Sequence, residues 1–305
     1  MRKAGKTQTE ISQALGFSQG TGSRELARNA GQRGYRFQQA QHSAQARQQQ
    51  VRHQPRKLTS RVRRALTRKL RAERWSPEQL SFWLRTERDL SLSPEWIYQM
   101  IWADKRRGGD RWRFLRRRGK RDNRRGAPHA GRGVLPPRVA IAERPAIVTA
   151  KSRLGDWEGD TLVGTRHHGR LLTHVERKSL FTIISKLSRP TAQATHRATV
   201  HRLKPLRRHV HTITYANGKE FSGHRHTAQC LQAHVFFATP YHAWERGVNE
   251  NTNGLIRDFF PKGTDFSTIH PATVAKVERL LNRRPRKSLG FQTPTEVFHA
   301  LATRR

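Results

Sequence analysis

Apolar residues recur at helical spacing in the first third of the chain. They repeat every four positions from Val62 to Leu70, the period of an amphipathic helix. Ser76 and Ser93 each open a Ser-Pro-Glu triplet, which supplies an N-cap, a first-turn proline and an acid near the positive helix end. This pattern predicts a compact three-helix domain over residues 58–105. We expect packing by Leu80, Trp83, Leu84, Trp96, Ile97, Met100 and Ile101.

A shorter helical pair is predicted over residues 7–29, with a turn at Gly16 and Ser18 as the cap of its second helix. It indicates an N-terminal helix-turn-helix over residues 1–37, which could be incomplete because no stabilising helix precedes it. The alternative is a helical hairpin without DNA contact. Ile11, Ala14 and Leu15 are expected to pack against Leu26. The predicted groove contacts are Gln19, Thr21, Ser23, Arg24 and Arg28.

Two linkers are predicted. Residues 38–57 are rich in Gln and Ala at their start and suggest a linker or a frayed helix. Residues 106–150 form a basic linker, since 12 of the 21 residues from Lys105 to Arg125 are Lys or Arg and Gly- and Pro-rich sequence follows. It could track a phosphate backbone, and the alternative is a solvated tail. Its predicted DNA contacts are Arg113, Arg116 and Arg117.

From Gly155 the pattern changes to short alternating runs typical of strands. The order β-β-β-α-β-α-β-α predicts an α/β ribonuclease H-like domain of the integrase type over residues 151–305, with helices at its C-terminal end. The whole chain is therefore expected to be multidomain, with all-α DNA-binding modules before the α/β domain. The expected strands cover 156–164, 171–175, 180–187, 210–215 and 234–237, and the expected helices 191–204, 223–231 and the segment within 241–263.

The net charge of the chain indicates the class of its binding partner. Sixty-one Lys and Arg against 22 Asp and Glu give a formal charge of +39, which favours a nucleic acid because each phosphate contact releases counterions. We find no apolar run long enough for a membrane span and no secretory signal. The single Cys230 excludes a disulfide framework. We therefore expect a cytoplasmic, nucleoid-associated bacterial protein without a membrane partner.

Acidic side chains mark two candidate positions. Alternation along the strand 156–164 places Asp156, Glu158 and Asp160 on one face. Three like charges are costly together unless a cation offsets them, so this face favours a metal site. On a helical wheel, Glu250 shares a polar face with Asn253, opposite an apolar side. Either an active-site ligand or a solvated surface acid explains Glu250.

Residues 155–298 resemble the catalytic domain of DDE transposases of the insertion sequence thirty family. The matching motifs are GDWEGD, NGKEF, PYHAWERGVNENTNGLIRDFFPKG and LNRRPRKSLGFQTPTEVF. The resemblance implies an enzyme in which three carboxylates hold two Mg²⁺ or Mn²⁺ ions for DNA strand cleavage and transfer. It also implies binding to terminal inverted repeats and target double-stranded DNA, as a homodimer or higher oligomer.

Carried over by motif, the first carboxylate and metal ligand is Asp160 and the third is Glu250. The middle position is Ala216, where the family pattern has Asp. Alanine offers no oxygen to a metal, so the chain as written is predicted to be inactive or severely impaired. An introduced substitution is favoured over natural decay, because the surrounding motifs are intact. Glu220 is a possible substitute ligand, with a structural role as the alternative.

The remaining motif residues have two interpretations each. His242, Trp244, Glu245 and Arg246 could position the scissile phosphate or flank the metals, or could serve packing and loop capping. The predicted DNA contacts in this domain are Arg246, Asn249, Asn253, Arg257 and Lys262. The competing function is a non-catalytic, sequence-specific DNA-binding protein, such as a domesticated transposase or repressor, for which Ala216 is the main support. Nonspecific nucleoid or RNA packaging is a third possibility.

Overall fold

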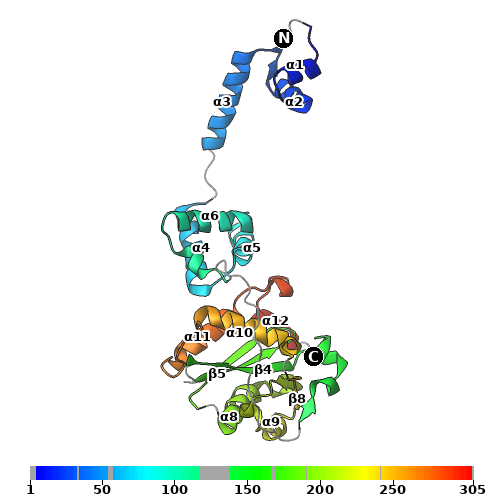
Figure 1. Cartoon of the computed structure of the whole chain (residues 1–305), viewed down its shortest axis with the longest axis vertical. Coiled ribbons are helices and arrows are strands. Elements are labelled where there is room, and N and C mark those ends of the chain that lie inside the picture. Colours follow the sequence, from blue (N-terminus) through cyan, green and yellow to red (C-terminus); the bar gives the residue numbers. More distant parts are fainter. Residues whose placement is uncertain are drawn as a thin grey trace. The chain divides into compact units, whose positions relative to one another are not determined.

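The computed structural model describes residues 5–32, 34–53, 58–116, 138–165, 169–189, 191–240 and 242–303. The chain divides at Ser60 into two compact units (Figure 1). Within the described ranges, no helix is both long and apolar enough to cross a membrane.

The first unit contains the predicted helical pair, α1 (Gln8–Ala14) and α2 (Gln19–Asn29), followed by a hairpin of β1 (Ala30–Gly31) and β2 (Gly34–Tyr35). Thr7 and Ser18 cap the two helices. The Gln- and Ala-rich residues form one helix, α3 (Phe37–His53), so the helical interpretation of this stretch is the correct one.

The packing predicted for this pair is wrong at Leu15, whose side chain is 55% exposed. Ser12 is buried instead, and a side chain on Gly22 would place its Cβ only 2.8 Å from the Ser12 hydroxyl. The two helices therefore approach through small residues, and Gly22 permits that contact.

The second unit begins with the predicted three helices, α4 (Ser60–Glu73), α5 (Pro77–Arg88) and α6 (Pro94–Arg106). Leu70, Leu84 and Ile101 have no exposed surface, and Trp83 is buried as predicted. Trp96 contradicts the prediction, since it is 37% exposed.

The predicted linker 106–150 is structured at both ends. A 3₁₀ turn, η2 (Arg111–Phe114), is bound to the helices because Arg111 pairs with Asp104 and its Nε donates to Thr67. At the other end, β3 (Val139–Ala140) pairs in parallel with the sheet, followed by the short α7 (Ala146–Thr149). The sheet domain therefore starts before the predicted boundary at 151.

The sheet has the order β3-β8-β7-β4-β5-β6. One half of it is an antiparallel meander of β4 (Asp156–Val163), β5 (Arg170–Glu176) and β6 (Thr182–Leu187). β7 (Thr212–Tyr215) and β8 (His234–Phe237) then add in parallel to β4. From β4 onward the strands and helices follow one another along the chain in the predicted order, and the mixed sheet confirms the α/β ribonuclease H-like class.

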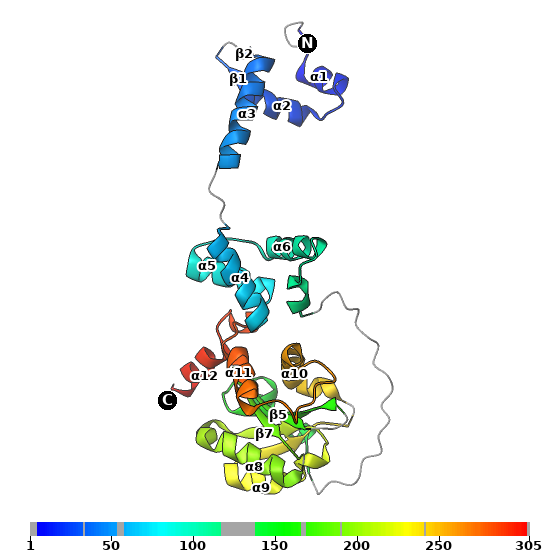
Figure 2. The ribbon, with the colours of Figure 1, turned by 90° about the vertical axis from the view of Figure 1, so that its left-hand side faces the viewer.

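Helices cover both faces of the sheet (Figure 1, Figure 2). α8 (Ala192–Leu203) and α9 (His224–Leu231) lie on one face, and α10 (Gly247–Phe259) and α11 (Pro271–Asn282) lie on the other. Each face has its own apolar cluster, the first around Trp157 and Tyr215 and the second around Leu171 and Phe266. α12 (Pro294–Ala302) adds Phe298 to the first cluster. The face under α10 carries the candidate chemistry.

Candidate active site

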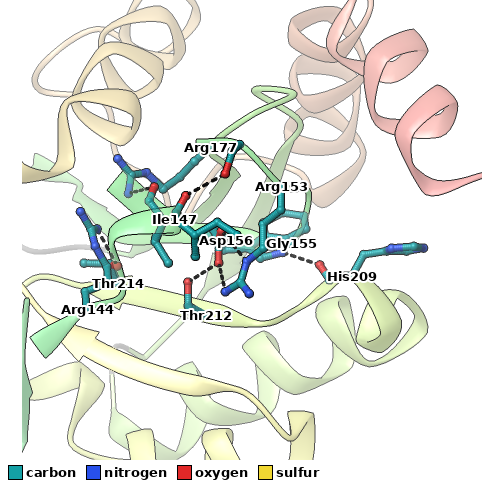
Figure 3. A network of polar contacts seen from close by, with 12 residues as sticks. Arg144, Ile147, Arg153, Gly155, Asp156, Arg177, His209, Thr212 and Thr214 are labelled. Atoms are coloured by element: carbon teal, nitrogen blue, oxygen red, sulfur yellow. Dashed lines mark hydrogen bonds and ion pairs between the residues drawn. The ribbon is translucent and has the colours of Figure 1, made fainter. Parts of the chain in front are cut away.

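The first acid of β4, Asp156, is held by neighbouring side chains. Its carboxylate accepts hydrogen bonds from Arg153 at 3.0 Å and from the Thr212 hydroxyl at 2.8 Å. Figure 3 shows both partners pointing at it, with Arg144 bound to Thr214 nearby. Asp156 has no exposed surface and every contact is internal, so its role is structural.

The second acid, Glu158, forms a buried ion pair. Its carboxylate lies 3.1 Å from the Nε of Arg177 and accepts a hydrogen bond of 2.8 Å from the backbone N–H of Asn249. Burial raises the pKa of Glu158, while the Asn249 N–H and the Arg177 charge oppose that rise. The Arg177 guanidinium also donates to the carbonyl of Val148, which ties β4 to α7.

The cations that offset these two acids are arginines. The metal site predicted from three acids on one face is therefore wrong for Asp156 and Glu158. Within the described ranges, no group of three or more His, Cys, Asp or Glu is arranged to hold a metal ion.

Asp160, the third acid, lies closer to the C-terminal end of β4 than the other two acids do. Its side chain keeps 24% of its surface exposed and lies 3.2 Å from the guanidinium of Arg246. Asn253 donates to the same carboxylate at 3.0 Å, and the backbone N–H of Thr161 donates at 2.9 Å. Burial raises the pKa of Asp160, and Arg246 opposes the rise. This carboxylate is polar, charged and reachable from solvent.

The residues of α10 that face β4 are spaced at nearly the same distance as the strand residues they contact. Four helix residues rise about 6 Å, close to the roughly 6.6 Å covered by two strand residues. Asn249 therefore meets Glu158, and Asn253 meets Asp160. The Thr173 hydroxyl of β5 lies 3.1 Å from the Oδ1 of Asn249 and 3.2 Å from the Oδ1 of Asn253, and its one hydrogen can be donated to either. The helix is held against the strand by two amide side chains that bond to β4 and β5.

This arrangement changes the role of Asn249. The residue has no exposed surface, and its side chain is bonded to Glu158 and Thr173. It is not available to DNA, so the structure gives it a positioning role in place of the predicted DNA contact. Asn253 is half-buried against Asp160, and Arg257 donates to the carbonyl of Val163 at 2.9 Å.

Glu250 lies in the turn of α10 between Asn249 and Asn253, and its side chain is exposed. The turn that carries it is the one bonded to Glu158 and Asp160. The third predicted carboxylate is therefore carried on a helix whose register against β4 is fixed.

Ala216 follows the last residue of β7. The parallel register pairs Glu158 with Thr214 and Gly159 with Tyr215. Ala216 is the residue directly after this last pair on one strand, and Asp160 is the residue directly after it on the other. Its methyl group is half-buried beside the apolar cluster of Tyr215.

Glu220 belongs to the other side of the sheet. In the turn η6 (Lys219–Phe221), it accepts from the Thr161 hydroxyl at 2.7 Å and pairs with Arg170 at 2.9 Å. Alternation along β4 puts Thr161 on the face opposite Asp160. These contacts favour the structural interpretation of Glu220.

The turn η7 (Ala243–Arg246) leads into α10. Glu245 accepts hydrogen bonds from the backbone and the hydroxyl of Thr239, which matches the loop-capping interpretation. Trp244 is 65% exposed and stacks on His242 with ring centroids 4.3 Å apart.

The other predicted DNA contacts lie mainly on surfaces of their own units. Ser23 is half-buried, and Arg117 lies outside the described residues. Arg116 also contacts α10, where it donates to the side chain of Asn251 at 2.8 Å. The exposed residues of this set are Gln19, Thr21, Arg24, Arg28, Arg113, Arg116 and Lys262.

Sequence reasoning missed three residues that hold the acids or α10 in place, namely Arg153, Arg177 and Thr173. Only Arg153 has a sequence signal, since it lies three residues before Asp156. A further requirement was missed at Gly159, where a Cβ would lie 2.3 Å from the ring of Tyr215. The glycine of the GDWEGD motif lets that ring pack against β4.

The sheet order and the helices on both faces define an α/β domain of the ribonuclease H-like class, with Asp160 on its strand β4. Comparison with known proteins extends this result. The chain is 44% identical over 290 residues to the transposase of insertion sequence element IS4351 from Bacteroides fragilis, covering 94% of this chain and 88% of the relative. It is 33% identical over 300 residues to transposase InsI of IS30A from Escherichia coli (strain K12), covering 94% of this chain and 77% of the relative.

The chain belongs to the IS30 family of insertion sequence transposases, as its motifs predicted. Among solved structures, it is similar to the catalytic core domain of BIV integrase, with a TM-score of 0.36 and 19% identity, covering 48% of this chain and 93% of that chain. No protein-family model matches the chain.

Proposed function

We propose that this transposase uses Asp160 and Glu250 as two of three carboxylates for DNA strand cleavage and transfer, and that Ala216 leaves the present chain inactive or severely impaired. The observation that supports the proposal is the last pair of the β4–β7 register, Gly159 with Tyr215, which Asp160 and Ala216 each follow directly in the chain. The fixed register of α10 supports the assignment of Glu250.

The proposed set of three carboxylates also implies a requirement for divalent metal ions. Mg²⁺ and Mn²⁺ bind carboxylate oxygens, and the full carboxylate set would hold two ions. The present residues do not fit that site, because position 216 has no oxygen and Asp160 is paired with Arg246 and Asn253. The chain as written therefore lacks the donor set for paired-metal catalysis.

Restoring the missing carboxylate tests the proposal. Ala216→Asp is expected to nick and join duplex DNA that carries the inverted repeats flanking the gene, with Mg²⁺ or Mn²⁺ present. Ala216→Asn, which has the same shape without the charge, is the matched control and should stay at the level of the present chain. A gel assay for cleavage and joining, together with Mn²⁺ titration by calorimetry, measures both steps.

If Ala216→Asp binds the repeats but neither cleaves nor joins them, the catalytic assignment is wrong. The chain is then the non-catalytic DNA-binding protein, the competing function that Ala216 supports. Equal affinity for unrelated sequences at matched salt would instead indicate nonspecific packaging.

The proposal also assigns DNA binding to the helices that precede α7 in the chain. The helices α1 and α2, and separately α4 to α6, are the candidate modules for inverted-repeat recognition, with Arg24, Arg28 and Arg113 exposed for phosphate contact. The net charge of +39 supports strong salt-dependent DNA binding and a place on the nucleoid. Action on two transposon ends requires at least a dimer on DNA.

A further inference from the structure

A second charged site lies away from Asp160. A cavity of about 330 Å³ is enclosed by residues of α4 to η2 on one side and by residues of α10 and the segment after α11 on the other. Its lining contains four arginines and one acid, Asp258. The arginines are Arg74, Arg116, Arg284 and Arg286. The positive charge of this cavity exceeds its negative charge.

The walls of the cavity are held by direct contacts. Gln79 donates to the carbonyl of Pro285 at 2.6 Å, and Arg284 donates to the carbonyl of Glu73 at 2.6 Å. The cavity is therefore formed in the fold and does not need to be induced.

Two of these arginines are buried without full use of their donors. Arg284 is 2% exposed and Arg286 is 8% exposed, and the Nε of each has no hydrogen-bond partner among the described residues. A guanidinium carries five donor hydrogens and stays charged in proteins. Leaving its donors unused in a buried position is costly.

The lowered pKa values of the two buried arginines also indicate that the cavity has too little negative charge to offset them. Burial, with the neighbouring arginines, lowers the pKa of Arg286 to about 9. Burial also lowers the pKa of Arg284 to about 10, with Arg116 and Arg74 adding to the effect and Asp258 opposing it. An anion in the cavity would offset the mutual repulsion and supply acceptors.

We propose that this cavity binds a phosphate group, with Arg284 and Arg286 as its buried donors and Arg116 at its rim. Arginine forks match phosphate oxygens in pairs. Trp102 and Phe114, which are half-buried, line the same cavity and offer aromatic surface to a sugar or base next to that phosphate. The phosphate belongs to the DNA backbone or to a free nucleotide, and the first source rests on the proposed function.

Orthophosphate is the probe for the first test. The full chain, without DNA or divalent metal, is titrated with phosphate against chloride at equal ionic strength, and the melting temperature and tryptophan emission are recorded. Arg286→Gln is expected to weaken phosphate binding at least tenfold. Arg283→Gln removes the same charge from an exposed neighbour that does not line this cavity, and should bind as the unchanged chain does.

If Arg286→Gln fails to fold, Arg116→Gln still tests the proposal, because Arg116 is exposed. It should weaken phosphate binding severalfold. Equal phosphate binding by the unchanged chain and Arg116→Gln, or equal losses in Arg116→Gln and Arg283→Gln, would overturn the proposal.

A competition experiment separates the two sources. Displacement of phosphate by duplex DNA assigns the site to a backbone phosphodiester, while binding of both together assigns it to a free nucleotide. Both outcomes support a phosphate site. Because the phosphate titration uses neither DNA nor metal, failure of strand cleavage by Ala216→Asp leaves its result unaffected.

Discussion

Glu158 and Asp160 lie two residues apart on one face of β4, yet their surroundings differ. Glu158 is buried and paired with Arg177, which is itself buried, and a backbone N–H completes its contacts. Asp160 shares its carboxylate between Arg246 and Asn253 and keeps solvent contact. An acid on the same face of the same strand is therefore part of a buried ion pair at one position and stays accessible to solvent two residues later. The difference comes from the partners and from the distance to the strand end.

The largest expected effect is on stability at the buried end. Arg177→Met leaves the Glu158 carboxylate without its cation and should lower the free energy of unfolding by about 3 to 5 kcal/mol. Arg246→Met makes the same change beside Asp160, which keeps Asn253 and water, and should cost about 1 kcal/mol or less. Urea unfolding of both variants measures the difference. Similar losses would remove the distinction between the two acids.

The next largest effect is the dependence of stability on pH. The buried base His174, on the other face of the sheet, contributes to this dependence with the opposite sign to Glu158 and Asp160. Burial lowers the pKa of His174 from 6.5 to about 3, so the unfolded chain binds its proton first as the pH falls. Stability from neutral His174 is full above pH 6.5 and is lost toward pH 3. The raised pKa values of Glu158 and Asp160 act oppositely, favouring the folded state on acidification.

We expect the His174 contribution to fall by about 2 kcal/mol between about pH 7.5 and about pH 5. Denaturant unfolding at the two pH values, on the unchanged chain and on His174→Gln, isolates this contribution. The variant should show a smaller loss on acidification. An equal loss in both proteins would show that other groups govern the dependence.

The smallest effect on stability is expected at the site itself. Asp160→Asn removes a partly exposed charge and should change the free energy of unfolding by about 1 kcal/mol or less. In the Ala216→Asp background, the same substitution should abolish metal-dependent strand cleavage. Thermal unfolding and the cleavage assay test the two halves of this prediction. A folded Asp160→Asn variant with undiminished cleavage would contradict the role of Asp160.

The order of strands and helices in the sheet domain could be predicted because alternation and capping are local signals. The partners of the acids could not, since Arg177 comes from a turn and Arg246 from a 3₁₀ segment, and no periodicity links either to β4. Strand β3 was missed because two residues are too few to show alternation. Trp96 was misplaced because an apolar helix position can still face solvent at the edge of a small module.

The sequence identified the candidate site residues Asp160, Ala216 and Glu250 through motifs that the family relationship supports. It did not predict that α10 is positioned by Asn249 and Asn253, because a helical wheel gives a face and not its partner. Asn249 was assigned to DNA on that basis and is buried against β4.

The matching steps of α10 and β4 have an evolutionary consequence. Spacing between the two elements is kept by uncharged amides and a threonine, none of which takes part in the missing carboxylate position. The contacts that align α10 with β4 therefore do not depend on which residue occupies position 216. The alignment of the two elements can be inherited whatever side chain stands at that position.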